Sequence, residues 1–392
     1  MVGTMAKIDD SVKKKDPELR FKGFTDEWEE RKLGDLGSVA MNKRIFKEQT
    51  SDVGDIPFYK IGTFGGTPDA FISRDIFEEY KSKYQYPEVG DILISASGSI
   101  GRTVVYQGYD EYFQDSNIVW LKHDQQLDNS FLKQFYSIVK WQGLEGSTIK
   151  RLYNKNILET KITLPSPEEQ QKIGSFFKQL DNTITLHQRK LDLLKEQKKG
   201  YLQKMFPKNG AKVPELRFAG FADDWEERKL GDITKISTGK LDANAMVENG
   251  KYDFYTSGIK KYRIDVAAFE GPSITIAGNG ATVGYMHLAD NKFNAYQRTY
   301  VLQEFLVDRS FIFSEIGNKL PKKIKQEART GNIPYIVMDM LTELKLSIPQ
   351  NNLEQQKIGS FFKQLDETIA LHQRKLDLLK EQKKGFLQKM FV

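Results

Sequence analysis

The sequence predicts an α+β protein with two globular domains of mixed α/β type, separated by a long antiparallel two-helix coiled coil with pseudo-twofold symmetry. Two observations lead to this expectation. Almost all of the 392 residues belong to a pattern that is written twice, and such internal repeats are typical of duplicated structural units. Each copy ends in a long segment whose apolar residues recur with helical spacing, so both copies are expected to end in helices.

The internal repeat divides the chain. The segment PELRFKGFTDEWEERKLGD at 17–35 returns as PELRFAGFADDWEERKLGD at 214–232, and EQQKIGSFFKQLD at 169–181 returns at 354–366. The residues between these repeats are nearly unalike. We therefore predict six parts, which are an N-terminal extension (1–16), a first globular domain (17–165), a first helix (166–206), a linker (207–213), a second globular domain (214–350) and a second helix (351–392).

The two globular domains share one weak internal match. GDILISASGSIGR at 90–102 resembles PSITIAGNGATVG at 272–284, with Ile92 and Ile94 matching Ile274 and Ile276. Alternating apolar residues before a glycine-rich turn indicate a strand that runs into a loop. We therefore expect the same fold in both domains, with different surface chemistry.

Each copy ends in a helix with a recognisable start. Ser166 and Glu169 stand where a capping box places its hydroxyl and its answering carboxylate, and Asn351 and Glu354 take these positions in the second copy. From there, residues recur alternately every four and three positions, the spacing of a coiled-coil seam. The seam positions are Ile173, Phe177, Leu180, Ile184, His187, Leu191 and Leu194, and then Ile358, Phe362, Leu365, Ile369, His372, Leu376 and Leu379. Each helix would span about 50 Å, and the other copy is the expected cover for its apolar stripe.

Histidine and glycine interrupt both helices. His187 and His372 occupy seam positions near the middle, either as a polar layer that fixes the register and weakens on protonation or as ordinary packing. Gly200 and Gly385 each cost about 1 kcal/mol relative to alanine. Either a close backbone contact requires these glycines or the helix ends fray there, and the sequence leaves both pairs of alternatives open.

The composition excludes several classes of protein. The chain has no cysteine and only four histidines, which excludes disulfides, iron–sulfur clusters and cysteine-ligated zinc and leaves little for a metal site. No apolar run reaches the roughly 18 residues of a membrane-spanning helix, and the first 15 residues are polar, unlike an export signal. We therefore expect a cytoplasmic protein without a membrane partner. The net charge of +6 fits a polyanionic partner such as DNA but is weak evidence alone.

The order of several short motifs, duplicated in one chain, resembles the specificity (S) subunits of Type I restriction-modification systems. The pattern W-x-x-x-K-L-G-D occurs at Trp28–Asp35 and Trp225–Asp232, GDILIS occurs at 90–95, and EQQKI leads into each long helix. The second domain departs from the family pattern, because PSITIA at 272–277 stands where the family often has a Gly-Asp-x-Leu segment. The resemblance covers nearly the whole chain beyond residue 16.

The resemblance implies a function without catalysis in this chain. Each globular domain would be a target-recognition domain for one half of a bipartite site in double-stranded DNA, and the helices would be the spacer between the halves. The helices would also dock two methyltransferase (M) subunits, with restriction (R) subunits in the full complex. These partners would use S-adenosylmethionine, ATP and Mg²⁺, so no cofactor and no metal is expected in this chain.

A protein that reads a split site needs basic side chains for phosphates and hydrogen-bonding side chains for base edges. In the first domain the candidates are Lys43, Arg44, Lys60, Thr63, Ser97, Ser99, Arg102, Gln114, Ser116, Asn117, Lys150 and Arg151. In the second they are Lys240, Tyr255, Ser257, Lys260, Lys261, Tyr262, Arg263, Asn279, Thr282, Gln297, Arg298, Lys322, Lys323, Lys325 and Arg329. Each of them is alternatively a solvated surface residue, and the pattern supports the set, not the individual residue.

Other functions compete with DNA recognition. The run Asn332-Ile333-Pro334-Tyr335 resembles the box with which amino-methyltransferases hold a target amine, but no glycine-rich loop for S-adenosylmethionine precedes it. Asp69 with Glu79 and Lys81 matches a loose nuclease pattern, and neither pattern is repeated in the other domain. The remaining alternatives are a coiled-coil scaffold and the DNA-binding subunit of a related Type IIB- or IIG-like methyltransferase system. Near-identical helices beside dissimilar domains favour constant protein partners and a variable DNA target.

Overall fold

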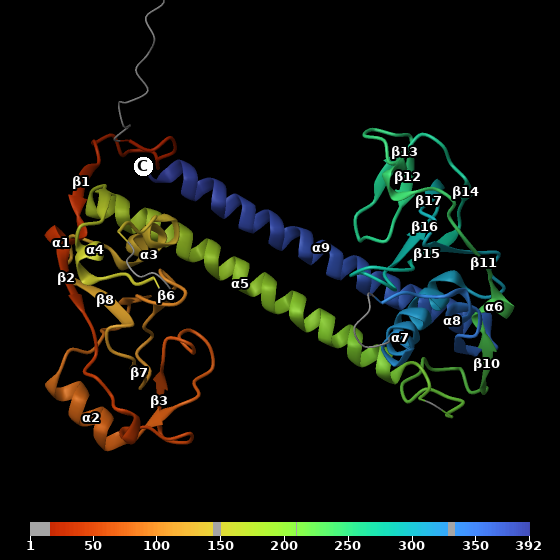
Figure 1. The fold of residues 1–392 in the computed structure, drawn as a ribbon, viewed down its shortest axis with the longest axis horizontal. Coiled ribbons are helices and arrows are strands. Elements are labelled where there is room, and N and C mark those ends of the chain that lie inside the picture. The colour runs from red at the N-terminus through yellow and green to blue at the C-terminus, as the bar shows by residue number, and fades with distance from the viewer. Residues whose placement is uncertain (1–15, 144–149, 209, 328–333) are drawn as a thin grey trace, which may run out of the picture. The chain divides into compact units, whose positions relative to one another are not determined.

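The computed structural model describes residues 16–143, 150–208, 210–327 and 334–392. They form two compact units. Unit 1 combines the chain up to Leu186 with Leu376–Val392, and unit 2 spans His187–Lys375. Each unit is a body of mixed helices and sheets that carries parts of two long helices (Figure 1). The predicted fold class is therefore confirmed, and each unit includes a piece of each long helix.

Unit 1 begins with short strands and helices and ends with the long helices. In chain order its elements are β1 (Glu29–Lys32), α1 (Leu33–Leu36), β2 (Gly37–Ala40), the 3₁₀ helix η1 (Lys47–Gln49), β3 (Ile56–Tyr59), β4 (Phe71–Ile72), α2 (Arg74–Lys83), β5 (Ile92–Ser95), β6 (Thr103–Val105), β7 (Tyr112–Phe113), β8 (Ile118–His123), α3 (Asn129–Ile138), α4 (Asn154–Leu158), β9 (Lys161–Leu164), the first part of α5 (Pro167–Lys204) and the last part of α9 (Asn352–Met390).

The central sheet of unit 1 has the strand order β2-β8-β5-β6, with all neighbouring strands antiparallel. All four residues of β5 are buried, as expected for a strand between two neighbours whose two faces are both covered. The strands β4, β3 and β7 form a smaller sheet, and β1 pairs with β9. The central sheet therefore supplies the rigid frame of this unit.

Unit 2 repeats this plan with longer strands. Its elements are the second part of α5, β10 (Trp225–Lys229), α6 (Leu230–Ile233), β11 (Lys235–Thr238), the 3₁₀ helix η2 (Ala243–Ala245), β12 (Tyr252–Tyr255), β13 (Tyr262–Ile264), β14 (Phe269–Glu270), β15 (Ser273–Ala277), β16 (Met286–Ala289), β17 (Lys292–Ala295), β18 (Thr299–Gln303), α7 (Arg309–Glu327), α8 (Met338–Thr342), β19 (Lys345–Pro349) and the first part of α9.

The sheets of unit 2 correspond to those of unit 1. The order β11-β18-β15-β16 repeats β2-β8-β5-β6, and β10-β19 repeats β1-β9. Ile94 pairs with Val119, and Ile276 pairs with Tyr300 at the corresponding place. The predicted match between the two isoleucine pairs is therefore confirmed. The clearest difference is the second sheet, which has four strands in the order β13-β12-β17-β14 where unit 1 has three.

The core of each unit is closed by aromatic residues from distant parts of the chain. In unit 1, Trp28 packs edge-on against Phe131 of α3, and the ring of Phe391, beyond α9, stacks on Phe131 at 5.0 Å. Phe177 of α5 lies beside Phe391. The equivalent cluster in unit 2 consists of Trp225, Phe311, Phe206 and Phe362. Such aromatic pairs add about 0.5–1.5 kcal/mol each beyond the burial of their area.

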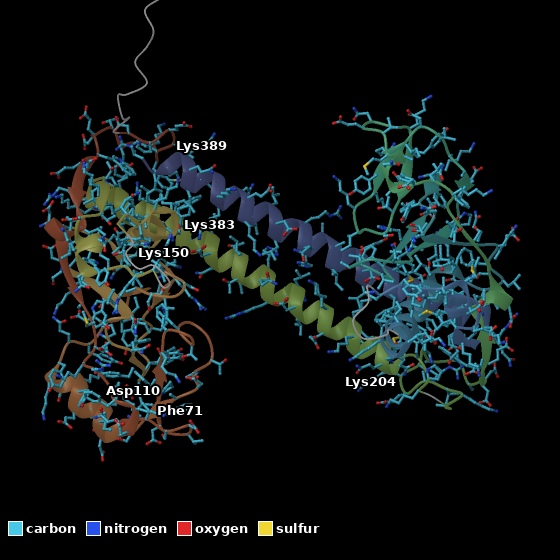
Figure 2. The ribbon with its side chains drawn as sticks, in the orientation of Figure 1. Phe71, Asp110, Lys150, Lys204, Lys383 and Lys389 are labelled. Atoms are coloured by element: carbon cyan, nitrogen blue, oxygen red, sulfur yellow. The ribbon has the colours of Figure 1, made fainter. Side chains whose placement is uncertain are left out.

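The two long helices are antiparallel within each unit. In unit 1, Phe176 of α5 contacts Phe386 of α9 edge-on at 5.1 Å, and Lys383, labelled in Figure 2, pairs with Asp181 at 2.7 Å. Residue numbers thus rise along α5 where they fall along α9, so the two helices run in opposite directions.

In unit 2, the ring centroids of His187 and His372 lie 5.8 Å apart, and Lys198 Nζ lies 2.5 Å from Asp366 Oδ1. Tyr201 then contacts Phe361 edge-on at 5.0 Å. The two histidines therefore face each other across the pair of helices. The lysine–aspartate pairs of the two units occupy equivalent positions of the repeat.

The predicted seam positions are buried or half-buried along both helices. The predicted positions Ile173, Phe177, Leu191, Leu194, Ile358, Phe362, Leu376 and Leu379 are buried, and Leu180, Ile184, His187, Leu365, Ile369 and His372 are half-buried. The four-and-three spacing thus identifies the inner face of each helix. Phe176 and Phe361, one position before a seam residue, are also half-buried, because they contact neighbouring aromatic rings.

The helix starts differ from the predicted capping box. Glu169 N donates to Ser166 Oγ at 3.4 Å, as expected. The Glu169 carboxylate instead accepts two hydrogen bonds from the Arg20 guanidinium, at 2.7 and 3.0 Å, and is almost fully buried. In unit 2, Arg217 holds Glu354 in the same bidentate way. The repeated PELRF segment therefore fastens to the first turn of each helix through this ion pair, since a guanidinium fork matches a carboxylate.

The helical glycines that require a close contact are not the ones that the sequence suggested. A Cβ atom added at Gly200 or Gly385 would meet nothing within 4 Å, so no close backbone contact explains these two residues. A Cβ at Gly174 would lie 2.8 Å from Phe131 N, and one at Gly359 would lie 2.6 Å from Phe311 N. These two glycines, about two turns into each helix, let α3 and α7 approach α5 and α9 closely.

Candidate nucleic-acid interface

Three loops meet at the same end of the central sheet in each unit. We call them loop cluster 1 (residues 96–102, 114–117 and 150–152) and loop cluster 2 (residues 278–285, 296–298 and 334–336). Each cluster joins the turn after the buried central strand, the residues before the next strand of the sheet, and a segment that precedes a short helix.

Loop cluster 1 is held by main-chain hydrogen bonds. Ala96 N donates to Asn117 O at 2.7 Å, and Ala96 O accepts from Leu152 N at 2.8 Å. Ser97 Oγ then donates to Asn117 Oδ1 at 2.8 Å. The Asn117 side chain is therefore oriented, with its amide nitrogen left to donate elsewhere.

The arginines of loop cluster 1 are partly tied to the backbone. Arg151 Nη2 donates to Ser116 O at 3.0 Å, and its guanidinium lies 5.8 Å from the ring centroid of Tyr153. Arg102 Nη2 donates to Gly65 O at 3.3 Å. Each guanidinium retains further donors after these single bonds, so both can bind an acceptor such as a phosphate oxygen or a base edge.

Loop cluster 2 has the same main-chain frame. Gly278 N donates to Arg298 O at 2.8 Å, and Gly278 O accepts from Ile336 N at 2.7 Å. Gly278, Arg298 and Ile336 thus take the places of Ala96, Asn117 and Leu152. The backbones of the two clusters correspond, while the side chains that they carry differ.

A cavity of about 190 Å³ opens in loop cluster 2. Its lining residues are Gly278, Asn279, Gln297, Arg298, Tyr300, Tyr335 and Ile336. Asn279 Oδ1 accepts a hydrogen bond from Ser257, Thr282 donates to Ser257 O, and Tyr300 OH donates to Ile336 O at 2.8 Å. These bonds fix the walls of the cavity before any ligand arrives.

The predicted residues separate into two groups in unit 1. Loop cluster 1 brings together Ser97, Ser99, Arg102, Gln114, Ser116, Asn117, Lys150 and Arg151. The other four predicted residues lie on separate segments. Lys43 lies over the Tyr84 ring, 5.0 Å from its centroid, and Arg44 lies 5.7 Å from the centroid of the Phe46 ring. Lys60 pairs with Asp69 at 2.9 Å, and its backbone N donates a hydrogen bond to the Thr63 hydroxyl at 3.1 Å. Gln114 ties the cluster to a neighbouring segment, because its Oε1 accepts a hydrogen bond from Ile61 N at 2.9 Å.

In unit 2, loop cluster 2 brings together Asn279, Thr282, Gln297 and Arg298. Tyr255 does not lie at the surface, because only 2% of it is exposed and its ring packs on Phe293. Arg263 is tied to the Asp253 carboxylate at 2.5 Å and to two backbone carbonyls. These two residues support the fold of the second sheet.

Several predicted residues surround that second sheet. Lys261 lies 5.3 Å from the Tyr255 ring centroid, Lys260 lies 5.3 Å from that of Tyr262, Ser257 binds Asn279, and Lys240 follows β11. Burial also lowers the pKa of nearby His287, which favours its neutral form. The lysines, not the histidine, are the positive charges of this region.

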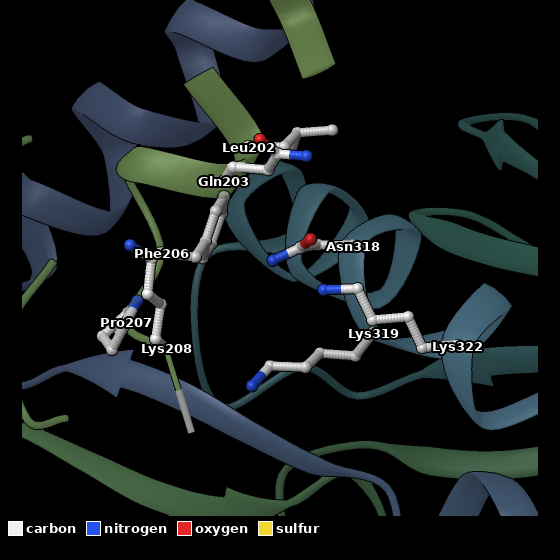
Figure 3. Close-up of a pocket in the computed structure, with 8 residues that line it drawn as sticks. All are labelled: Leu202, Gln203, Phe206, Pro207, Lys208, Asn318, Lys319 and Lys322. Atoms are coloured by element: carbon white, nitrogen blue, oxygen red, sulfur yellow. The ribbon is translucent and has the colours of Figure 1, made fainter. Parts of the chain in front are cut away.

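The lysines of α7 face a groove of about 480 Å³ (Figure 3). Lys322 lines it together with Lys319 and Lys208, above an apolar floor that includes Phe206 and Leu202. Among the other predicted residues of this region, Lys323 pairs with Glu327, Lys325 is exposed, and Arg329 falls outside the described residues. The groove therefore gathers three ammonium groups, of which the sequence reasoning named only one.

Comparison with known proteins identifies the family. The sequence profile described as "Type I restriction modification DNA specificity domain" matches residues 25–196 and again residues 222–381. The chain belongs to this family. Each matched segment contains one globular body and one long helix, so the specificity domain occurs twice, as the internal repeat indicates.

Individual relatives agree with this assignment. A putative type I restriction enzyme specificity subunit of Haemophilus influenzae is 58% identical over 157 residues, which is 39% of this chain and 41% of that protein. The type I restriction enzyme EcoDI specificity subunit of Escherichia coli is 33% identical over 167 residues, or 42% of this chain and 37% of that one. The chain thus aligns with about two-fifths of the length of these relatives.

A crystal structure has a similar fold over a longer span. The S subunit of a type I restriction-modification system from M. genitalium superposes with a TM-score of 0.70, covering 96% of this chain and 99% of that one at 18% identity. At this identity the likeness concerns the fold of the specificity domains.

Three exposed aromatic residues beside the loops of the specificity domains were not among the predicted DNA-contacting residues. Tyr335 is 57% exposed, and its backbone forms an isolated bridge with Asn279. Tyr153 and Tyr285 are 46% and 40% exposed. An aromatic residue next to a predicted polar loop was the available signal.

The rival nuclease pattern does not assemble in the first specificity domain. Asp69 pairs with Lys60, Glu79 pairs with Lys83, and Lys81 lies near Asp110, so the nuclease pattern does not converge. Among the residues that the structure describes, no group of three or more His, Asp or Glu side chains could hold a metal ion. Asn332 and Ile333 of the amino-methyltransferase box lie outside the described residues. None of the described helices is long and apolar enough to cross a lipid bilayer.

The long helices of the specificity domains expose matching leucines. Leu186 and Leu193 on α5 are 64% and 52% exposed, and their repeats Leu371 and Leu378 on α9 are 60% and 48% exposed. Each pair lies seven residues apart, so its two members share one face of the helix. Exposed leucines that recur in both copies indicate two equivalent apolar surfaces.

Proposed function

We propose that this chain is the sequence-recognition subunit of a Type I restriction-modification complex, in which each unit reads one half of a bipartite site in double-stranded DNA. The observation that carries this proposal is the pair of loop clusters. The same backbone frame, with Ala96 or Gly278 at its centre, presents different side chains in the two units. A common fold with different polar loops is what two readers of two different half-sites require.

Contacts of two kinds would act together. The lysines along the groove of Figure 3, such as Lys322 and Lys319, would bind backbone phosphates and fix the orientation of the DNA. Polar side chains of the loop clusters would then meet base edges, where the major groove presents a distinct pattern for each base pair. Phosphate contacts supply most of the affinity and none of the direct sequence information.

The helices would have two roles. Their seam would keep the two readers at a fixed spacing of about one turn of DNA, and their exposed leucine pairs would dock two methyltransferase subunits in equivalent ways. The near-identity of the two helix sequences supports this second role, because identical partners require identical surfaces. Restriction subunits would join the same assembly.

The chemistry would belong to the partners. S-adenosylmethionine would serve the methyltransferase subunits, and ATP and Mg²⁺ would serve the restriction subunits. This chain would supply binding and positioning alone, in the cytoplasm where the chromosome lies.

The proposal is tested by co-expression with the cognate methyltransferase, followed by mapping of modified bases on a plasmid library with random inserts. The expected result is one split motif with an invariant gap. A second arm measures DNA binding of the purified chain against salt, where the affinity should fall steeply as phosphates exchange with counterions.

Different results would favour the alternatives. A chain that binds no DNA and leaves the modification pattern unchanged would be a scaffold. A continuous motif without a gap would contradict the two-reader arrangement. Methylation by the purified chain alone, with S-adenosylmethionine, would show that the catalytic activity belongs to this chain.

A further inference from the structure

The arginine of loop cluster 2 differs from the other arginines around it. Arg217 holds Glu354 at 2.7 Å, Arg263 holds Asp253 at 2.5 Å, and Arg309 pairs with Asp290, while Arg228 lies 3.8 Å from Glu226. Arg298 is exposed and has no carboxylate partner among the described residues. Its five donors are therefore available to a ligand.

The cavity beside Arg298 has the size and polarity for the edge of a base. Its volume of about 190 Å³ is below the roughly 300–1,000 Å³ of pockets that enclose a small molecule or cofactor. The polar residues that line it are Asn279, Gln297, Arg298, Tyr300 and Tyr335, and none of the lining residues is acidic. The lining therefore offers neutral and positive donors to an acceptor-rich ligand.

The backbone around the cavity is fixed before binding. Gly278 bonds both Arg298 and Ile336 through its main chain, and Tyr300 OH closes the floor by donating to Ile336 O. Binding would therefore order the Arg298 side chain without also having to order its backbone. The position of Arg298 thus suits recognition that depends on the direction of its hydrogen bonds as well as on its charge.

We infer that Arg298 reads a guanine in the half-site of unit 2, through two hydrogen bonds to its O6 and N7 atoms, with Gln297 and Tyr335 beside it. This inference rests on the proposed function and names the residue and the base. Guanine is the base whose major-groove edge carries two adjacent acceptors, which match the guanidinium fork. The corresponding residue of unit 1 is Asn117, so the two half-sites are read by different chemistry at this position.

The experiment uses the full chain in complex with its methyltransferase and a library in which every position of the site is randomised. Arg298→Lys keeps the positive charge and removes the fork, and Arg298→Ala removes both. Arg228→Lys is the matched control, since Arg228 is in the same unit and outside loop cluster 2. Thermal unfolding of each complex checks that the variants are folded. If the Arg298→Ala complex is unfolded, the Arg298→Lys complex alone tests the inference.

The wild-type complex should require guanine at one position of the second half-site. Both Arg298 variants should lower that preference by about 5- to 150-fold, the loss expected for one bidentate contact. The first half-site and all other positions of the second should keep their preferences, and Arg228→Lys should change nothing.

Three results would overturn the inference. The second half-site could contain no G·C pair, the Arg298 variants could keep every base preference, or they could weaken all sequences equally, which is the signature of a phosphate contact. Each of these leaves the proposed function intact if the wild-type complex modifies a split motif. If the wild-type complex modifies no split motif, the proposed function fails and this inference fails with it.

Discussion

Glu315 makes the stability of unit 2 depend on pH. Its carboxyl group lies on α7 with no exposed surface, accepts a hydrogen bond from Ser347 N at 3.2 Å, and has Lys319 Nζ at 3.9 Å. Burial raises the pKa of Glu315 to about 7, against a weaker opposing effect of Lys319 and Lys322. A carboxyl group in such surroundings prefers its protonated form.

The sign of the effect follows from the raised pKa of Glu315. Below about pH 4.5 the group is protonated in the folded and the unfolded chain, and its contribution to the free energy of unfolding is fully present. Between about pH 4.5 and 7 only the unfolded chain releases the proton, so stability falls as the pH rises. The loss amounts to about 3 kcal/mol, from a shift of between two and three pH units at 1.36 kcal/mol each, and it changes little at higher pH.

Glu315→Gln tests this reasoning, because glutamine imitates the protonated acid. We expect the variant to match the wild type near pH 4 and to exceed its free energy of unfolding by up to about 3 kcal/mol near pH 8. Urea unfolding of the fluorotryptophan-labelled chain, followed by the ¹⁹F signal of Trp225, reports on unit 2. The signal of Trp28 reports on unit 1, where Phe135 stands at the position equivalent to Glu315. The unfolding of unit 1 should therefore be the same in the variant and the wild type. Equal pH slopes for variant and wild type at Trp225 would refute the argument.

Four further substitutions test the packing of unit 2. Arg217→Met should lower the free energy of unfolding by about 3–5 kcal/mol, because it leaves Glu354 buried without its partner. Adding Glu354→Leu to this variant should restore the lost stability in the same urea titration. Gly359→Ala should destabilise by about 1–3 kcal/mol through its clash with α7, whereas Gly200→Ala, in open space, should stabilise by up to about 1 kcal/mol. A common sign for the two glycine variants in thermal unfolding would contradict the contacts described here. Phe206→Ala should cost about 3–5 kcal/mol, and hydrogen exchange should place the loss in α7 and β10, not in unit 1.

The sequence predicts the long helices well because their signal is local and repeated. Ile173 and Phe177 start a spacing that continues for many turns, and each further turn adds to the same stripe. The central strands are predictable for a similar reason, since β5 is buried on both faces and its first three residues are apolar. Patterns of this kind require no knowledge of which segment lies opposite.

The contacts that escaped prediction join residues far apart in the chain. Glu169 fits a capping box in sequence, yet its carboxylate is held by Arg20, about 150 residues earlier. The close approach at Gly174 depends on Phe131, which no helical spacing reveals. In the candidate site, Tyr335 joins Asn279 only because the loops at one end of a sheet converge. Which polar residues share a loop cluster is set by topology, and a single sequence does not specify it.

The division of the chain has a consequence for synthesis. Unit 2 is continuous from His187 to Lys375, so all of its residues are present once that stretch has left the ribosome. Most of unit 1 is made before unit 2, but its core also needs Leu387, Met390 and Phe391, which are made after all of unit 2. Domains usually fold in the order in which they emerge. Here the body that is translated first is completed last, and until then its aromatic core around Trp28 stays open to water and to chaperones.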